Sequence, residues 1–321
     1  MATSNVQPNP HYLTLAGGAY TSIRDLTRLR YASREIDRIV GERAKNPLSG
    51  LMTSSFRGRG IDFAEVRNYQ PGDDIRTIDW RVTARTRKPH TKLFQEEKER
   101  PVLLVVDQTQ TMFFGSRVLF KSVLAAQAAA LLAWTALDKG DRVGGSVYSD
   151  TEHREIRPRR SKHSVLRLVH ELDSFNHQLS RENHPEHTLG MGTVLRNLRR
   201  VVKHGSAIFI ISDFHGFDQE ARLHFEQLAK HNDMVGVHIS DLLERDLPRP
   251  DIYTITNGTE KARINTGDRQ FRNAYHDNFE NHISGVRQLF SRQKSPLFEI
   301  QTHLPLISQF VGAYNAWARQ M

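Results

Sequence analysis

The chain of 321 residues contains no cysteine. It therefore forms no disulfide and offers no thiolate to a metal ion, which fits a reducing compartment. No stretch approaches the roughly 18 uninterrupted apolar residues of a membrane-spanning helix. Residues 1–10 also lack the basic start and apolar core of a signal peptide. We accordingly expect a cytoplasmic protein without a membrane span.

Sequence signatures of several enzyme classes are absent as well. The chain has no phosphate-binding loop, no nucleophile elbow and no dinucleotide-binding glycine motif. Gly58 and Gly60 flank Arg59, but a third glycine and a following helical pattern are missing. We therefore expect no catalytic residue and a protein that is not an enzyme.

Positive charge is in excess. The 45 lysines and arginines outnumber the 36 acidic residues, which gives a net charge of +9. Such a surplus occurs in nucleic-acid-binding proteins and also on ordinary solvated surfaces. Because the basic residues are spread along the chain, we favour a solvated surface and do not expect nucleic acid as a partner.

The most informative segment begins at Pro101 and ends at Asp107. Its consecutive branched aliphatic residues, 102–106, indicate a strand buried on both faces, as in parallel sheets. A second apolar run begins at Ala207 and again ends in an aspartate, Asp213. Helical and strand patterns alternate after Pro101, which predicts an α/β fold with a doubly wound, mostly parallel sheet.

Composition divides the chain into three parts. Residues 1–48 comprise a leader and an amphipathic helix, expected from about Ser22 to Ala44. Residues 49–100 are dense in Gly, Arg and Asp with short β-like runs, so we expect a small β-rich subdomain. Residues 101–321 form the predicted α/β domain.

Oxygen-bearing side chains follow both acid-tipped strands. Because the carboxyl ends of parallel strands lie at one edge of a sheet, we expect Asp107 and Asp213 to face one crevice. Thr109 and Thr111 follow the first strand, and Thr193 follows a glycine-containing loop. Hydroxyl and carboxylate oxygens are the ligands of Mg²⁺ and Mn²⁺, so the pattern predicts a divalent-cation site.

The glycines near Thr193 and an alternative role for the two aspartates also bear on this site. The loop before Thr193 contains Gly190 and Gly192, which suit close packing beside a ligand. As an alternative to metal binding, Asp107 and Asp213 accept hydrogen bonds from loop amides and cap helices. Both interpretations stay open at this point.

The order Asp-x-Thr-x-Thr, Gly-Thr and Ile-Ser-Asp resembles the metal-ion-dependent adhesion site of von Willebrand factor A-like domains. A longer segment, from Arg57 to Trp80, resembles the bacterial family called domain of unknown function 58. Its letters read RGRGIDFAEVRNYQPGDDIRTIDW. This segment is more specific than the metal motif, and the resemblance covers roughly residues 30–320.

The resemblance implies a fold of von Willebrand factor A type and a partnership with MoxR-type AAA+ ATPases in chaperone-like maturation of protein complexes. It implies that Thr109, Thr111 and Thr193 bind the cation directly, while Asp107 and Asp213 act through water and hydrogen bonds. An acidic side chain of a partner would complete the shell. The family pattern has serines at positions 109 and 111, so the β-branched threonines leave two alternatives, a working site and a vestigial one.

The small subdomain supplies a second group of candidates, for partner binding. An alternative is that its acids and arginines form a salt-bridged turn. The candidate residues are Arg57, Arg59, Asp73, Asp74, Asp79 and Trp80.

The sequence thus predicts a non-catalytic adaptor that binds an unknown protein client through a divalent cation. Two alternatives come from other functional classes. One is a Mg²⁺-dependent phosphohydrolase that uses the same acids, and the other is a basic nucleic-acid-binding protein.

Overall fold

The computed structural model describes residues 18–40, 62–70, 78–95, 101–180, 189–256 and 260–318. The chain divides into two compact units, one made of Met1–Ser54 with Pro101–Met321 and the other of Ser55–Arg100. The helix expected near the N-terminus is α1 (Ile23–Val40), which belongs to the larger unit. The domain limits expected at residues 48 and 100 stay a prediction.

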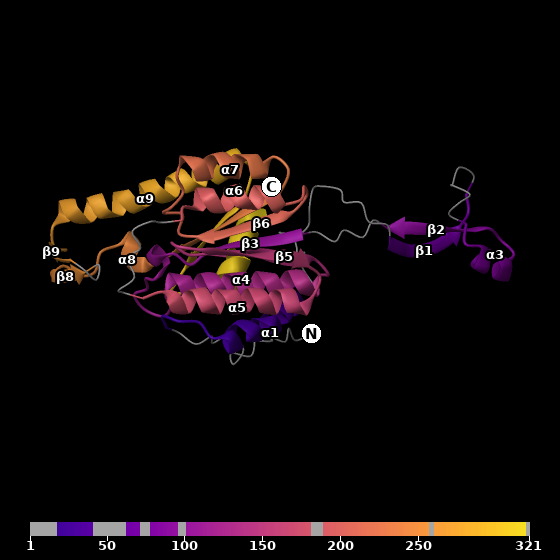
Figure 1. Ribbon diagram of the computed structural model, residues 1–321, viewed down its shortest axis with the longest axis horizontal. Helices are drawn as coiled ribbons and strands as arrows, with labels where there is room; N and C mark the ends of the chain where they lie inside the picture. The colour runs from indigo at the N-terminus through magenta and orange to yellow at the C-terminus, as the bar shows by residue number, and fades with distance from the viewer. Residues whose placement is uncertain are drawn as a thin grey trace, which may run out of the picture. The chain divides into compact units, whose positions relative to one another are not determined.

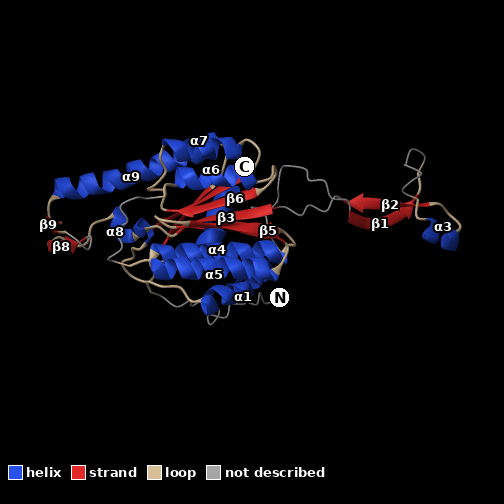
Figure 2. Cartoon of the chain, in the orientation of Figure 1, coloured by secondary structure: helices blue, strands red, loops and turns tan. Residues whose placement is uncertain are grey.

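A six-stranded sheet forms the centre of the larger unit (Figure 1, Figure 2). Its strand order is β10-β7-β6-β3-β4-β5, in which only β5 is antiparallel to its neighbour. This is the mostly parallel α/β sheet that the sequence predicts. The strands are β3 (Pro101–Asp107), β4 (Arg142–Tyr148), β5 (His153–Arg159), β6 (Ala207–Ser212), β7 (Asp233–Ser240) and β10 (Leu297–Gln301).

Helices cover both faces of this sheet because its central strands are apolar on both sides. One core joins the sheet to α1, α4, α5 and α10, and the other joins it to α6, α7 and α9 (Figure 1). Alternate residues of β3 separate the two cores, since Leu104 lies in the first and Leu103 and Val105 lie in the second. The helices are α4 (Lys121–Asp138), α5 (Lys162–Gln178), α6 (Met191–Val201), α7 (Gln219–Ala229), α9 (Arg269–Arg292) and α10 (Leu306–Ala318).

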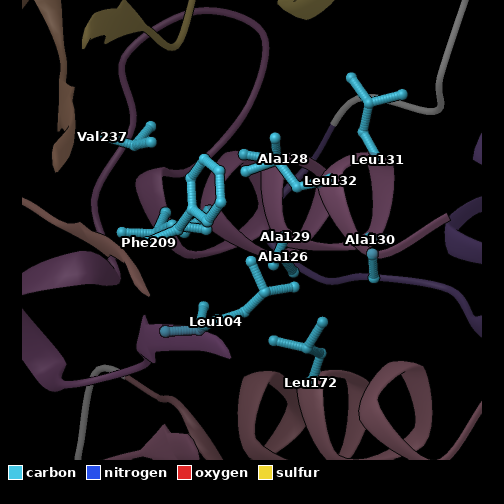
Figure 3. Close-up of a cluster of buried hydrophobic side chains, with 14 of the residues drawn as sticks. Leu104, Ala126, Ala128, Ala129, Ala130, Leu131, Leu132, Leu172, Phe209 and Val237 are labelled. Carbon is cyan, nitrogen blue, oxygen red and sulfur yellow. The ribbon is translucent and has the colours of Figure 1, made fainter. Parts of the chain in front are cut away.

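Helix α4 is buried on all sides, as its nearly continuous Ala and Leu content predicts. Residues 121–136 are all buried. Its alanines lie close to Leu104 and Phe209 of the sheet (Figure 3). On its other side, the indole N–H of Trp134 donates to the carbonyl of Leu26 in α1 at 3.1 Å. Helix α4 therefore stands at a fixed position between the sheet and α1.

Short elements lie beyond the carboxyl ends of the parallel strands. They are the 3₁₀ turn η3 (Gln110–Met112), helix α8 (Leu242–Arg245), and the hairpin of β8 (Ile252–Thr256) and β9 (Lys261–Asn265). Figure 1 shows α8 and the hairpin at the same end of the unit. The Arg272 guanidinium holds the hairpin base by donating to the carbonyls of Leu247, Pro248 and Thr266.

The smaller unit contains an antiparallel pair, β1 (Asp62–Asn68) and β2 (His90–Gln95), with helix α3 (Trp80–Thr86) between them in sequence. Helix α3 ends where Arg87 takes a left-handed conformation, with φ of 57°. Across both units, none of the described helices is long and apolar enough to cross a membrane.

Candidate functional site

Strands β3 and β6 are neighbours and end side by side, which places Asp107 next to Ser212. Their register pairs Val106 with Ile211, one residue before this point. The Ser212 hydroxyl donates to Asp107 Oδ2 at 2.6 Å and accepts the N–H of Phe214 at 2.9 Å. Ser212 thus joins the two strand ends and also holds the turn that contains Asp213.

Two of the three predicted threonine ligands, Thr109 and Thr111, follow β3. The N–H and hydroxyl of Thr109 donate to Asp107 Oδ1 at 2.9 and 2.7 Å. The hydroxyl oxygens of Thr109 and Thr111 are 3.1 Å apart. Neighbouring ligands on an octahedral Mg²⁺ lie about 3 Å apart. The spacing of these two oxygens therefore fits such an ion.

Asp213 contacts a cation that belongs to the protein. The ammonium of Lys121, the first residue of α4, lies 2.7 Å from Asp213 Oδ2 and 2.5 Å from Glu244 Oε1. Burial acts to raise the pKa of Asp213, but the positive charge of Lys121, the charge of His215 and the hydrogen bonds from both residues together lower this pKa to about 2. Burial likewise acts to lower the pKa of Lys121, and the two carboxylates together raise it.

Asp107 is 3% exposed and has no ion-pair partner among the described residues. Burial, and then the negative charge of Asp213, raises its pKa to about 6. When ionised, Asp107, Asp213 and Glu244 carry three negative charges, and Lys121 offsets one of them. Negative charge therefore remains at this end of the sheet, so this donor set fits a divalent cation.

Thr193 lies in the first turn of α6. Its hydroxyl accepts a hydrogen bond from Arg196 at 3.4 Å, and in the described part of the chain no hydrogen bond joins it to the other four predicted ligands. Asp150 instead connects the segment after β3 with Leu189, which lies just before α6. Its carboxylate accepts the N–H of Gln110 at 2.6 Å, and its carbonyl accepts the N–H of Leu189 at 2.5 Å.

The two glycines before Thr193 differ in their surroundings. A Cβ on Gly192 would lie 2.9 Å from the Cβ of Glu220 and 3.0 Å from the N of Ala221, both in α7. Gly192 thus allows α6 to pack closely on α7, whereas a Cβ on Gly190 would meet open space. The close approach at Gly192 is therefore made by α7, and packing of Gly190 beside a ligand stays a prediction.

Sequence reasoning missed Lys121 and Glu244 as members of the site. One ligand atom each from Asp213, His215 and Glu244 lies within 4.8 Å of the others. The ring of His215 stacks on His282 at 4.5 Å. Lys121 had a sequence signal, because it is the only charged residue in the apolar run from 118 to 137. Glu244 had none that pointed to this edge.

Four of the predicted partner-binding residues, Arg57, Arg59, Asp73 and Asp74, lie outside the described residues. The carboxylate of Asp79 is the N-cap of α3, because it accepts the N–H groups of Arg81 at 3.0 Å and Val82 at 3.2 Å. Trp80 begins this helix, and the residue is 68% exposed.

Comparison with known sequences gives a family match. The model of the family described as "Protein of unknown function DUF58" matches residues 65–284. The uncharacterized protein Rv1480 of Mycobacterium tuberculosis is 28% identical over 232 residues, which cover 71% of this chain and 69% of that protein. The uncharacterized protein YeaD of Bacillus subtilis is 35% identical over 81 residues, which cover 24% of this chain and 20% of that protein.

Comparison with solved structures gives neighbours of low sequence identity. The conserved hypothetical protein BatB from Bacteroides thetaiotaomicron is 12% identical, with a TM-score of 0.40, and the match covers 68% of this chain and 99% of that one. A von Willebrand factor type A protein from Catenulispora acidiphila is 11% identical, with a TM-score of 0.38 and coverage of 72% and 45%.

Proposed function

This chain belongs to the DUF58 family, and on that premise we propose that it is a non-catalytic, cytoplasmic adaptor that binds a protein partner through Mg²⁺ or Mn²⁺. The observation that carries the proposal is the oxygen group at the end of β3. There the hydroxyls of Thr109 and Thr111 lie 3.1 Å apart, beside the buried carboxylate of Asp107.

The hydrogen bonds of this group leave ligand atoms free for a cation. The Thr109 hydroxyl donates a hydrogen bond to Asp107, so the lone pairs of its oxygen point elsewhere. We propose Thr109, Thr111 and Thr193 as direct ligands, with Asp107 and Asp213 acting through water and hydrogen bonds. A bound cation supplies an open coordination position at which a partner carboxylate gains a directional bond.

The threonines support a working site over a vestigial one. Each keeps its hydroxyl within hydrogen-bond distance of a neighbouring site oxygen despite the extra methyl group. The negative charge around Asp107 also remains partly uncompensated, which favours a divalent ion.

The proposed partners are a MoxR-type AAA+ ATPase and a protein client of that ATPase. Support comes from the resemblance of residues 57–80 to this family and from the family match. The described fold is compatible with an interaction role, because the oxygen group lies at the carboxyl end of the central strand β3.

The cation is tested by titrating the full chain with Mg²⁺ and Mn²⁺ in a calorimeter. The variants T109V and T111V keep the β-branched shape and remove one hydroxyl each. Because each variant loses one ligand, we expect its Mg²⁺ affinity to be roughly tenfold weaker or more. T27V, in α1, is the matched control and should bind as the wild type does. Equal binding by all four proteins would contradict the proposal.

The partner is tested by affinity capture from the source cell with Mg²⁺ or with a chelator, followed by mass spectrometry. We expect an AAA+ ATPase only with Mg²⁺ and only with the wild type and T27V. Capture that persists in chelator would refute cation-dependent docking. Mg²⁺-dependent turnover of a phosphate ester by the pure protein would instead support the phosphohydrolase alternative.

A further inference from the structure

Lys121 is a fully buried lysine in a position that normally disfavours positive charge. Its residue is 0% exposed. It is also the first residue of α4, and the N-terminus of a helix carries a partial positive charge. A buried ammonium at this place is retained only if carboxylates contact it directly. Asp213 and Glu244 do so, at 2.7 and 2.5 Å.

The carboxylates around Lys121 are themselves held in place. Asp213 Oδ1 accepts the N–H of His215 at 3.1 Å. Glu244 Oε2 accepts the N–H of Asp241 at 2.9 Å, in a capping box that begins α8. The two oxygens that face Lys121 therefore have fixed positions, and the ammonium lies between them.

The surroundings of this ammonium have the composition of a metal site. One carboxylate oxygen from Asp213, one from Glu244 and one ring nitrogen of His215 lie within 4.8 Å of one another. Two carboxylates and an imidazole form a ligand set that suits Zn²⁺ and also binds Mn²⁺. In this chain, the cation in contact with the two carboxylates is Lys121.

We infer that the Lys121 ammonium occupies the position that Asp213, His215 and Glu244 would otherwise offer to a transition metal. The ammonium is covalently part of the chain, so this cation does not exchange. Lys121 is thus a specificity-determining residue. It keeps zinc away from the imidazole and leaves the hydroxyl oxygens of Thr109 and Thr111 as the exchangeable position for a hard cation.

The inference deepens the proposed function but rests on it only for the last step. Mg²⁺ binding by the wild type tests the proposed function, whereas zinc binding by a Lys121 variant tests the inference. If the wild type does not bind Mg²⁺ but a Lys121 variant gains zinc, the proposed function is refuted and the inference about Lys121 is supported.

The test is the zinc content of the full chain after incubation with Zn²⁺ and desalting, measured by mass spectrometry of the metal. The variant K121A removes the ammonium and leaves space, so we expect about one more Zn²⁺ per chain than in the wild type. Comparing the two subtracts zinc held by surface histidines. In the double variant K121A/H215A the extra zinc should be lost. Equal zinc content in K121A and the wild type would overturn the inference.

Lys162 provides the matched control, because it is the first residue of α5 and is exposed. K162A should retain as much zinc as the wild type. If K121A does not fold in metal-free buffer, Zn²⁺ added during refolding should restore its circular dichroism spectrum, and it should not do so for K121A/H215A. Failure of zinc to rescue folding would count against the inference.

A measurement on the wild type avoids substitution altogether. The Lys121 ammonium should give a protected proton–nitrogen signal in lysine-labelled protein, because it is buried and bonded to two carboxylates. That signal should persist at saturating Zn²⁺. Its loss on adding Zn²⁺ would show that metal displaces the lysine and would overturn the inference.

Discussion

The Ser212 hydroxyl donates a 2.6 Å hydrogen bond to the Asp107 carboxylate, although 105 residues separate the two in sequence. Through this bond the ends of β3 and β6 form one edge. The same hydroxyl accepts the N–H of Phe214, whose φ of 58° is left-handed and unusual for a phenylalanine. Ser212 therefore supports both the Asp107 carboxylate and the strained turn after Asp213.

Replacing Ser212 tests this support. In S212A a buried donor to Asp107 and an acceptor for Phe214 are both lost, so we expect the free energy of unfolding to fall by about 2–3 kcal/mol. Urea denaturation measures it. The exposed Ser308 supplies the control, since S308A should change stability by less than about 0.5 kcal/mol. An unchanged midpoint in S212A would show that the turn does not depend on this hydroxyl.

The ionisation of Asp107 should make stability depend on pH in metal-free buffer. Burial, and then the charge of Asp213, raises its pKa from 3.8 to about 6 in the folded state. The folded state therefore binds this proton more tightly than the unfolded state, and stability falls as pH rises from about 4 to above 6. The rise in pKa corresponds to about 3 kcal/mol.

The variant D107N isolates this effect. Its stability relative to the wild type should improve by up to about 3 kcal/mol between pH 4 and pH 7, because asparagine does not ionise. Denaturation at several pH values measures the difference in free energy of unfolding between D107N and the wild type. Contributions from the other titrating groups largely cancel in this difference. A constant difference over this range would contradict the raised pKa of Asp107.

Removing Lys121 should destabilise the fold. In K121M the carboxylates of Asp213 and Glu244 lose their buried cation, and breaking such a pair typically costs about 3–5 kcal/mol. The double variant K121M/E244Q removes one of the two uncompensated charges and should recover part of this loss. Additive destabilisation by the two substitutions would show that Lys121 and Glu244 do not interact energetically.

The proposed cation site allows a test of its threonines. The double variant T109S/T111S restores the serines of the family pattern and keeps both hydroxyls, so its Mg²⁺ affinity should equal or exceed that of the wild type. Calorimetric titration measures it. If the methyl groups weaken the site, the serine variant should bind Mg²⁺ more tightly than the wild type. Weaker binding by the serine variant would argue against hydroxyl ligation.

In the smaller unit, Asp79 should stabilise α3 as its N-cap. D79A leaves the N–H groups of Arg81 and Val82 without this acceptor, at a cost of about 1 kcal/mol to the helix. Hydrogen exchange at these two amides should accelerate in the full chain. D79N retains a capping oxygen and should exchange almost as the wild type does; equal acceleration in both variants would point to a role of the charge instead.

Much of the fold follows from local patterns. The apolar runs before Asp107 and Asp213 predicted two strands buried on both faces, and the structure confirms the mostly parallel α/β sheet that they imply. The all-round apolar content of residues 121–136 likewise predicted a helix buried on every side. These predictions succeeded because burial on both faces leaves a direct record in the order of apolar residues.

The details of the site were less accessible. Gly192 was interpreted as a loop residue near a ligand, but it lies inside α6 and faces α7. A glycine signals that something approaches closely, and the sequence does not say what approaches. Asp150 was missed for a related reason, since its contacts with Gln110 and Leu189 connect loops that are distant in sequence.

The sequence by itself determined the sheet, the acid at the end of each of two strands, and the threonines beside Asp107, because these depend on periodicity and short spacing. Only the tertiary structure decided which charge faces each acid. Lys121 lies 92 residues from Asp213 and 123 from Glu244, and packing of α4 and α8 at the sheet edge brings the three together. Electrostatic pairing depends on distance in space, so Asp213 is paired with a lysine while Asp107 has no ion-pair partner among the described residues.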